Sequence, residues 1–155
     1  MKNVIFTLAL LVSFTISALA QTATSTAGGS TECEVDCLFT SCKIKCTHQH
    51  GGAVCTCAWG FASCACGGAN PSVSATATQL SKIDGLVNVL AGYNSGSAKA
   101  VVGELNALKG SLGSGDSATS RSRIDNVVNY MKSLGYEERA AVNKYFERNY
   151  VDERL

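Results

Sequence analysis

All eight cysteines of the chain lie between residues 33 and 66, and this clustering limits the folds that the segment can adopt. They form four close pairs, two with three intervening residues and two with one: Cys33 and Cys37, Cys42 and Cys46, Cys55 and Cys57, Cys64 and Cys66. Zinc ribbons and thioredoxin-like sites rest on a two-residue spacing, which no pair has. An even number of cysteines in so short a segment is typical of a disulfide framework.

Residues 1–20 have the pattern of a secretory signal peptide. Lys2 precedes an apolar and hydroxyl-rich run, and Ala18-Leu19-Ala20 forms a small-residue cleavage site before Gln21. The run of roughly 15 residues is short for a bilayer span, and no second apolar stretch of about 20 residues follows. We therefore expect a secreted, extracellular mature chain without a transmembrane segment.

The net charge of this mature chain is expected to be close to zero. The full sequence has 13 Lys and Arg against 12 Asp and Glu, and removal of the signal peptide takes away Lys2. Nucleic acids and anionic membranes attract proteins through clustered positive charge. We therefore expect no nucleic-acid partner and no purely electrostatic membrane attachment.

Composition divides the mature chain into four segments. Residues 21–32 are rich in Ser, Thr and Gly and predict a flexible leader, and residues 33–66 hold the cysteines. Residues 67–79 contain the only proline and predict a linker. Residues 80–155 have no cysteine and show helical spacing of apolar residues. This division predicts a disulfide-held module followed by a module held by packing.

The helical domain contains an internal repeat at an offset of 41 residues, in which SKIDGLVNVL (81–90) aligns with SRIDNVVNYM (122–131). Each copy begins with Ser-x-x-Asp, which resembles a capping box with Ser81 or Ser122 as the cap. The copies, 81–108 and 122–150, predict a duplicated helical hairpin, that is, a four-helix bundle. Its aromatic side chains are assigned to the core: Tyr130, Tyr136, Tyr145, Phe146 and Tyr150.

Helical geometry suggests how the cysteine module could be linked. A helix sets the sulfurs of CxxxC on one face about 6 Å apart along its axis, and a strand sets those of CxC at a similar separation. A CxxxC helix laid on a CxC strand could therefore form two bridges. Thr40-Ser41 offers an N-terminal cap and Gly51-Gly52 a stop, so we predict a short helix at about 41–49.

The stretch SCKIKCTHQHGGAVCTCAWGFASCAC resembles the defensin-like, cystine-stabilised alpha-beta peptides, which share CxxxC on a helix, a glycine-rich turn, a hairpin and a closing CxC. The resemblance covers residues 33–66 only and implies one short helix plus a β-hairpin, hence an α+β module ahead of the helical bundle. It also implies bonds from Cys42 to Cys64 and from Cys46 to Cys66, with Cys37 or Cys33 joined to Cys57 or Cys55.

The resemblance implies a secreted, non-enzymatic protein that needs no cofactor and acts by binding, in host defence, toxicity or another interaction with a second organism. The alternative is a metallothionein-like protein in which the eight thiolates, with His48 and His50, hold metal ions. A second alternative is a secreted structural or interaction protein. A nucleophilic-cysteine enzyme would need an unpaired thiol beside a histidine, and an even number of cysteines leaves no thiol unpaired.

The acidic residues Glu137 and Glu138, in the helical domain, are expected to face water.

The segment AWGFAS, between the two CxC pairs, is the candidate contact surface. Trp59 and Phe61 flank Gly60, so a short loop would present two large aromatic side chains to an unknown protein or membrane surface. The alternative is that one of the two rings packs on Leu38 or Ile44.

A disulfide framework predicts the mass of the secreted protein. Four bridges should lower the intact mass by about 8 Da relative to the reduced chain, since each bridge removes roughly 2 Da of hydrogen. Mass spectrometry with and without reductant measures this difference. Bound zinc or copper together with eight alkylatable thiols would contradict it.

Overall fold

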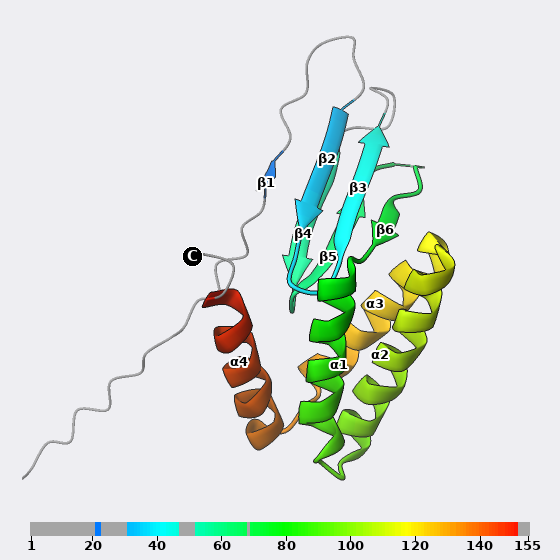
Figure 1. Ribbon diagram of the computed structural model, residues 1–155. Coiled ribbons are helices and arrows are strands. Elements are labelled where there is room, and N and C mark those ends of the chain that lie inside the picture. The colour runs from blue at the N-terminus through cyan, green and yellow to red at the C-terminus, as the bar shows by residue number, and fades with distance from the viewer. Residues whose placement is uncertain (1–20, 23–30, 47–51, 68, 152–155) are drawn as a thin grey trace, which may run out of the picture.

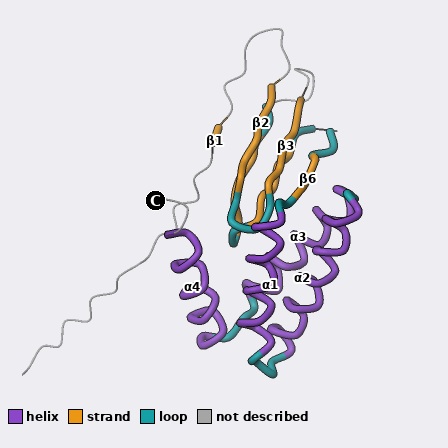
Figure 2. The backbone as a smooth tube through the Cα atoms, viewed as in Figure 1, coloured by secondary structure: helices purple, strands orange, loops and turns teal. Residues whose placement is uncertain are grey.

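The computed structural model describes residues 21–22, 31–46, 52–67 and 69–151. Two small sheets are followed by four helices, which confirms the α+β class (Figures 1 and 2). The strands are β1 (Gln21–Thr22), β2 (Thr31–Asp36), β3 (Ser41–Cys46), β4 (Val54–Ala58), β5 (Phe61–Ala65) and β6 (Ser72–Ser74). The helices are α1 (Ala77–Ala91), α2 (Gly96–Ser114), α3 (Ser117–Lys132) and α4 (Tyr136–Val151). The predicted signal peptide, His48 and His50 lie outside the described residues.

Two antiparallel hairpins dominate the cysteine-rich segment. The strand orders are β1-β4-β5 in one sheet and β2-β3-β6 in the other. In the β2–β3 hairpin, inward side chains of Cys and aliphatic residues alternate with outward charges, and the register sets Cys33 opposite Ile44 and Val35 opposite Cys42. On the outer face, the amines of Lys43 and Lys45 lie 3.1 Å from the carboxylates of Glu34 and Glu32, respectively. The hairpin therefore hides its sulfurs and exposes neutralised charge.

The helix predicted at 41–49 is wrong over residues 41–46, which form β3; residues 47–49 lie outside the described part. In SCKIKC, buried and exposed residues alternate with period two, as in a strand with one face covered. The spacing of Cys42 and Cys46 suits a strand face as well as a helix face, because four residues are two full strand periods. The described part of residues 33–66 thus holds two hairpins in place of a helix and one hairpin.

The predicted linker also carries structure. Within residues 67–79, β6 pairs with β3, with Val73 opposite Cys42. The backbone N–H of Val73 donates to the Ser117 hydroxyl at 3.2 Å, which ties this strand to the start of α3. This segment therefore joins the sheet to the helices through its own hydrogen bonds.

The helix starts differ from the predicted capping boxes. In α1, Thr76 is the N-cap and forms a capping box with Gln79, and in α3 the cap is Asp116. Ser81 and Ser122 therefore lie inside their helices, so both predicted caps are wrong. Thr76 and Asp116 lie five and six residues before the predicted caps, and their side chains accept from the free amides at these earlier helix starts.

Glu138 was expected to face water and is instead buried. Its carboxylate accepts a hydrogen bond at 2.7 Å from the backbone N–H of Gly135, at the start of α4. A carboxylate in the first turn of a helix satisfies amides that have no partner within the helix. The neighbouring Glu137 is exposed, as expected.

The aligned segments bury equivalent positions. In α1 the inward residues are Ile83, Leu86 and Leu90, and in α3 they are Ile124, Val127 and Met131, each pair separated by the repeat offset of 41. This match agrees with a duplicated hairpin, and the duplication itself stays a prediction.

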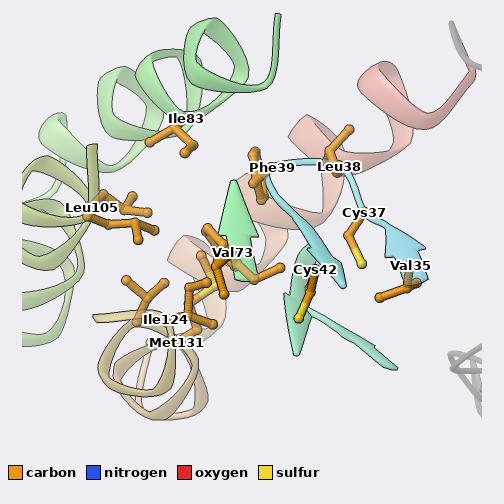
Figure 3. Close-up of a cluster of buried hydrophobic side chains, with 14 of the residues drawn as sticks. Val35, Cys37, Leu38, Phe39, Cys42, Val73, Ile83, Leu105, Ile124 and Met131 are labelled. Carbon is orange, nitrogen blue, oxygen red and sulfur yellow. The ribbon is translucent and has the colours of Figure 1, made fainter. Parts of the chain in front are cut away.

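Strands and helices share one continuous core (Figure 3). The ring of Phe39, in the β2–β3 turn, lies 4.7 Å from that of Phe61 in β5. On its other side, Phe39 lies 6.5 Å from Tyr145 and 5.7 Å from Phe146, both in α4. The Gln79 side-chain amide in α1 donates to the Cys37 carbonyl at 2.9 Å, which adds a polar link between the two parts.

Gly85 makes room for Tyr145, and this close approach generates a stability prediction. A Cβ on Gly85 would contact the Tyr145 hydroxyl and lie 2.9 Å from Cζ, while that hydroxyl donates to the Lys82 carbonyl at 2.6 Å. Gly85→Ala should therefore lower the free energy of unfolding by about 1–3 kcal/mol, because the ring must move.

The control is Gly103→Ala in α2, where a Cβ meets nothing within 4 Å. This change should raise the free energy of unfolding by about 0.5–1 kcal/mol, because alanine favours a helix over glycine. Urea denaturation of both variants measures the difference. Equal effects would show that the α1–α4 contact is not as tight as described.

Candidate functional site

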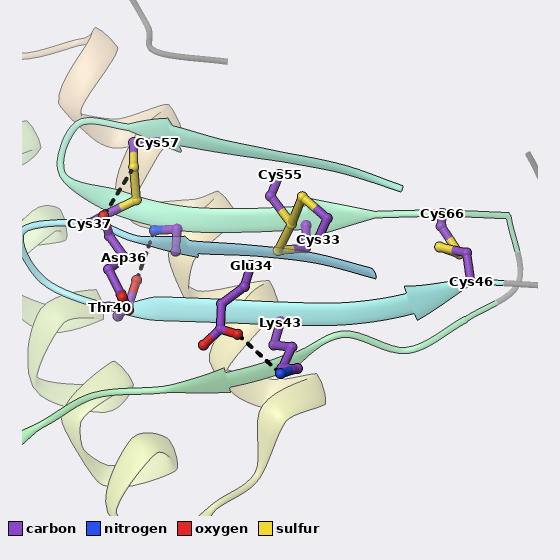
Figure 4. Close-up of a disulfide and its surroundings, with 12 residues drawn as sticks. Cys33, Glu34, Asp36, Cys37, Thr40, Lys43, Cys46, Cys55, Cys57 and Cys66 are labelled. Carbon is purple, nitrogen blue, oxygen red and sulfur yellow. Dashed lines mark hydrogen bonds and ion pairs between the residues drawn. A yellow bond between two sulfur atoms is a disulfide. The ribbon is translucent and has the colours of Figure 1, made fainter. Parts of the chain in front are cut away.

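The cysteines lie between the two hairpins, where β2 faces β4 and β3 faces β5 (Figure 4). Disulfides join Cys37 to Cys57 and Cys46 to Cys66, with Cα–Cα separations of 5.9 and 6.2 Å. Each bond links the first hairpin to the second. The Cys46–Cys66 bond is one of the pairings implied by the resemblance.

Four further sulfurs gather at the centre of this sandwich. The sulfur of Cys55 lies close to those of both Cys33 and Cys64, with Cα–Cα separations of 6.0 and 4.1 Å, and it can bond only one of them. Cys42 is buried and carries no bond. Burial raises the pKa of the Cys42 thiol to about 11, and a hydrogen bond from the Cys64 backbone opposes this rise in part. The pairing of all eight cysteines therefore stays a prediction.

The metal-binding alternative finds no ligand group in the described part of the chain. There, no three or more His, Cys, Asp and Glu side chains are placed to hold an ion. His48 and His50, the histidines of that hypothesis, lie outside the described residues. Bonded sulfurs are not ligands, because a metal binds the thiolate.

The β2–β3 turn is hydrogen-bonded to the second hairpin. The backbone N–H of Cys37 donates to the Thr40 carbonyl at 3.0 Å and closes the turn. The fully buried Thr40 hydroxyl accepts from the backbone N–H of Ala62 in β5 at 2.8 Å. The sequence predicted Thr40 as a helix cap, whereas its hydroxyl instead connects the turn to β5.

The tip of the β4–β5 hairpin is a two-residue turn made by Trp59 and Gly60. Both have positive φ, 53° and 77°, as the tightest hairpin turns require. A Cβ on Gly60 would lie 2.8 Å from Cδ2 of Phe39, and the Gly60 carbonyl accepts from the backbone N–H of Phe39 at 2.8 Å. Glycine is needed here for both its conformation and its lack of a side chain.

The two candidate contact residues at this tip have different environments. Phe61 is 0% exposed and packs on Phe39, so it offers no contact surface while the tip is closed. Trp59 is half-buried, with its ring 6.3 Å from that of Phe146 in α4. The packing alternative therefore describes Phe61, whose ring packs on that of Phe39 within the core cluster that also contains Leu38 and Ile44.

The most exposed aromatic side chains of the described part belong to the helices. Tyr136, at the start of α4, is 89% exposed, and Tyr130, near the end of α3, is 42% exposed. Both were assigned to the core, which is wrong, because the helical spacing of apolar residues does not show which aromatic rings lie at helix ends. The Tyr145 and Phe146 assignments hold in part, since both are partly buried against the core.

The chain matches no family model, no curated protein and no solved structure.

Trp59, the only tryptophan, reports on the tip. Because its ring is half-buried against Phe146, its fluorescence should lie to the blue of free indole in the isolated protein, and Phe146→Ala should shift it to the red by exposing it. Tyr136→Ala, at the far end of the same helix, is the control and should leave the emission unchanged. Emission at the free-indole position in the unmodified protein would contradict the Trp59–Phe146 contact.

Proposed function

We propose that the mature chain is a secreted, non-enzymatic, defensin-like protein that acts by binding, in host defence, toxicity or another interaction with a second organism. The observation that carries this proposal is the placement of buried cysteine pairs between two hairpins. Disulfides of this kind form and persist in oxidising compartments, and they hold small secreted modules that have little apolar core. The signal-peptide pattern of residues 1–20 supports the same compartment.

The same placement favours a scaffold over a metal store. A metallothionein-like protein needs its thiolates free, whereas Cys37, Cys57, Cys46 and Cys66 are bonded in pairs. The raised pKa of the Cys42 thiol also disfavours the thiolate that a metal would bind.

The proposed contact surface is the distal end of the bundle, defined by Tyr130 and Tyr136. This end lies at the α3–α4 connection, away from the sheets (Figure 1). Tyrosine combines an apolar ring with a polar hydroxyl and is enriched where proteins bind partners. None of the described helices has the length and apolar character needed to cross a membrane.

Removal of both rings tests this surface. Tyr130→Ser with Tyr136→Ser should weaken the retention of labelled full-length mature protein on zwitterionic phosphatidylcholine vesicles or intact microbial cells by about tenfold or more, as expected for aromatic anchors. Tyr130→Phe with Tyr136→Phe is the matched control and should retain most of the binding, because it keeps the rings. Vesicle binding should vary little with salt, because the chain is close to neutral.

Two results would count against the proposal. Equal binding by the serine and phenylalanine variants would remove the distal end as the contact surface. Secretion with stoichiometric zinc or copper and no retention on vesicles or cells would favour the metal-binding alternative.

A further inference from the structure

We propose that Cys42 and Cys64 form a disulfide, so that four bonds join the two hairpins: Cys33–Cys55, Cys37–Cys57, Cys42–Cys64 and Cys46–Cys66. The Cys42–Cys64 bond is also implied by the resemblance, but three observations in the structure support it without the resemblance and without any assumption about function.

The first observation is the valence of Cys55. A cystine sulfur forms one bond to another sulfur, so the contacts of Cys55 with Cys33 and Cys64 are mutually exclusive. The Cα–Cα separation of Cys33 and Cys55, 6.0 Å, falls within the usual range for disulfides, whereas that of Cys55 and Cys64, 4.1 Å, falls below it. Cys55 and Cys64 are directly opposite residues of one hairpin, so their proximity follows from strand pairing alone. Assigning Cys55 to Cys33 leaves Cys64 without a partner.

The second observation is a repeated geometry. On the facing strands β2 and β4, the bonds Cys33–Cys55 and Cys37–Cys57 are four residues apart on one chain segment and two apart on the other. Because β3 is antiparallel to β2 and β5 is antiparallel to β4, β3 and β5 face each other in the same relative sense.

The known bond on this second strand pair is Cys46–Cys66. The same steps from it, four residues back along β3 and two back along β5, lead to Cys42 and Cys64. The bonds between β2 and β4 have the same spacing, so this sandwich can hold two bonds whose cysteines are four residues apart on one strand and two apart on the other.

The third observation is proximity. The Cys64 backbone lies near enough to the Cys42 sulfur to lower the pKa of that thiol. Both side chains are almost fully buried, on strands that face each other. Cys42 is the only unbonded cysteine among those that the structure describes. It therefore lies beside Cys64, the cysteine that has no partner once Cys55 is assigned to Cys33.

The bond forms by thiol–disulfide exchange. The two thiols lose two protons and two electrons as the S–S bond forms, and the electrons reduce a protein disulfide of the secretory compartment to its dithiol. Exchange needs a thiolate, and burial raises the pKa of the Cys42 thiol, so the bond forms more readily before the two hairpins pack together.

Peptide mapping of the unmodified protein tests the assignment. After alkylation in denaturant, cleavage at Phe39 and Lys43 isolates Cys42 on a peptide of residues 40–43, and cleavage at Phe61 and Lys82 gives residues 62–82, with Cys64 and Cys66. We expect no alkylated cysteine, and the 40–43 peptide should be recovered bound to the 62–82 peptide until reduction. The same linked product also carries the other cysteine peptides, because Cys66 is bonded to Cys46 on the peptide that holds Cys55 and Cys57. An alkylated 40–43 peptide, or fragments in which Cys42 is bonded directly to a cysteine outside the 62–82 peptide, would overturn the proposal.

Two single variants of the full chain identify the partner within the 62–82 peptide. Cys64→Ser should release Cys42 as the alkylated residue, whereas the matched control Cys66→Ser should release Cys46 and leave the 40–43 peptide bound. If either variant fails to fold, tandem mass spectrometry of the linked wild-type peptides makes the same distinction. Alkylation of Cys42 in the Cys66→Ser protein, or a fragment that joins Cys42 to Cys66, would contradict the assignment.

Discussion

The packing of Phe39 is the contact on which the arrangement of strands and helices depends. Its fully buried ring lies between Phe61 of the second hairpin and the Tyr145–Phe146 pair of α4. An aromatic side chain buries a large area and holds defined angles to its neighbours, so one residue can orient several elements. Gly60 is constrained by this ring because no Cβ fits beside it. The turn that closes the first hairpin therefore also positions the second hairpin and the last helix.

The two parts of the chain reach stability by different means. The sandwich has few large apolar side chains, and much of its interior is sulfur. Bonds that close segments of 20–22 residues should each contribute on the order of 3 kcal/mol by restricting the unfolded chain. The helices instead bury Leu, Ile, Val and Met along continuous stripes. Reducing agents should therefore act first on the sandwich. Loss of its packing would then affect α4 through the contacts of Phe39 with Tyr145 and Phe146.

The features that depend on local sequence pattern could be predicted from the sequence. The four helices and the buried stripe through Ile83 and Leu90 follow from helical spacing, and the hairpin turn at Gly60 follows from a glycine between two CxC pairs. Cysteine spacing alone could not separate helix from strand at 41–46, because Cys42 and Cys46 share a face in both. The charges decide the matter: Lys43 and Lys45 alternate with buried residues and face Glu34 and Glu32 across the hairpin.

Features that depend on distant contacts were not predictable in this way. Nothing local marks Val73 as a strand residue opposite Cys42, or Glu138 as a buried cap. The candidate site changed for the same reason, since the tip was expected to expose Phe61 and instead inserts it against Phe39, which is separated from it by 22 residues of sequence.

The positions of the cysteines and of the exposed tyrosines give the molecule two chemically distinct ends. The sulfurs lie between the sheets, whereas Tyr136 is the first residue of α4, which starts at the end of the bundle away from the sheets (Figure 1). Glu138 fixes the first turn of that helix by accepting from Gly135, and the Tyr145 hydroxyl fixes its middle by donating to Lys82 in α1. The proposed contact residues are therefore held by helix packing and not directly by disulfides. Tyr145 and Phe146 also contact Phe39, so the covalent framework influences the placement of the distal end through these aromatic contacts. The hydrogen bonds of Gln79 with Cys37 and of Val73 with Ser117 add two further links.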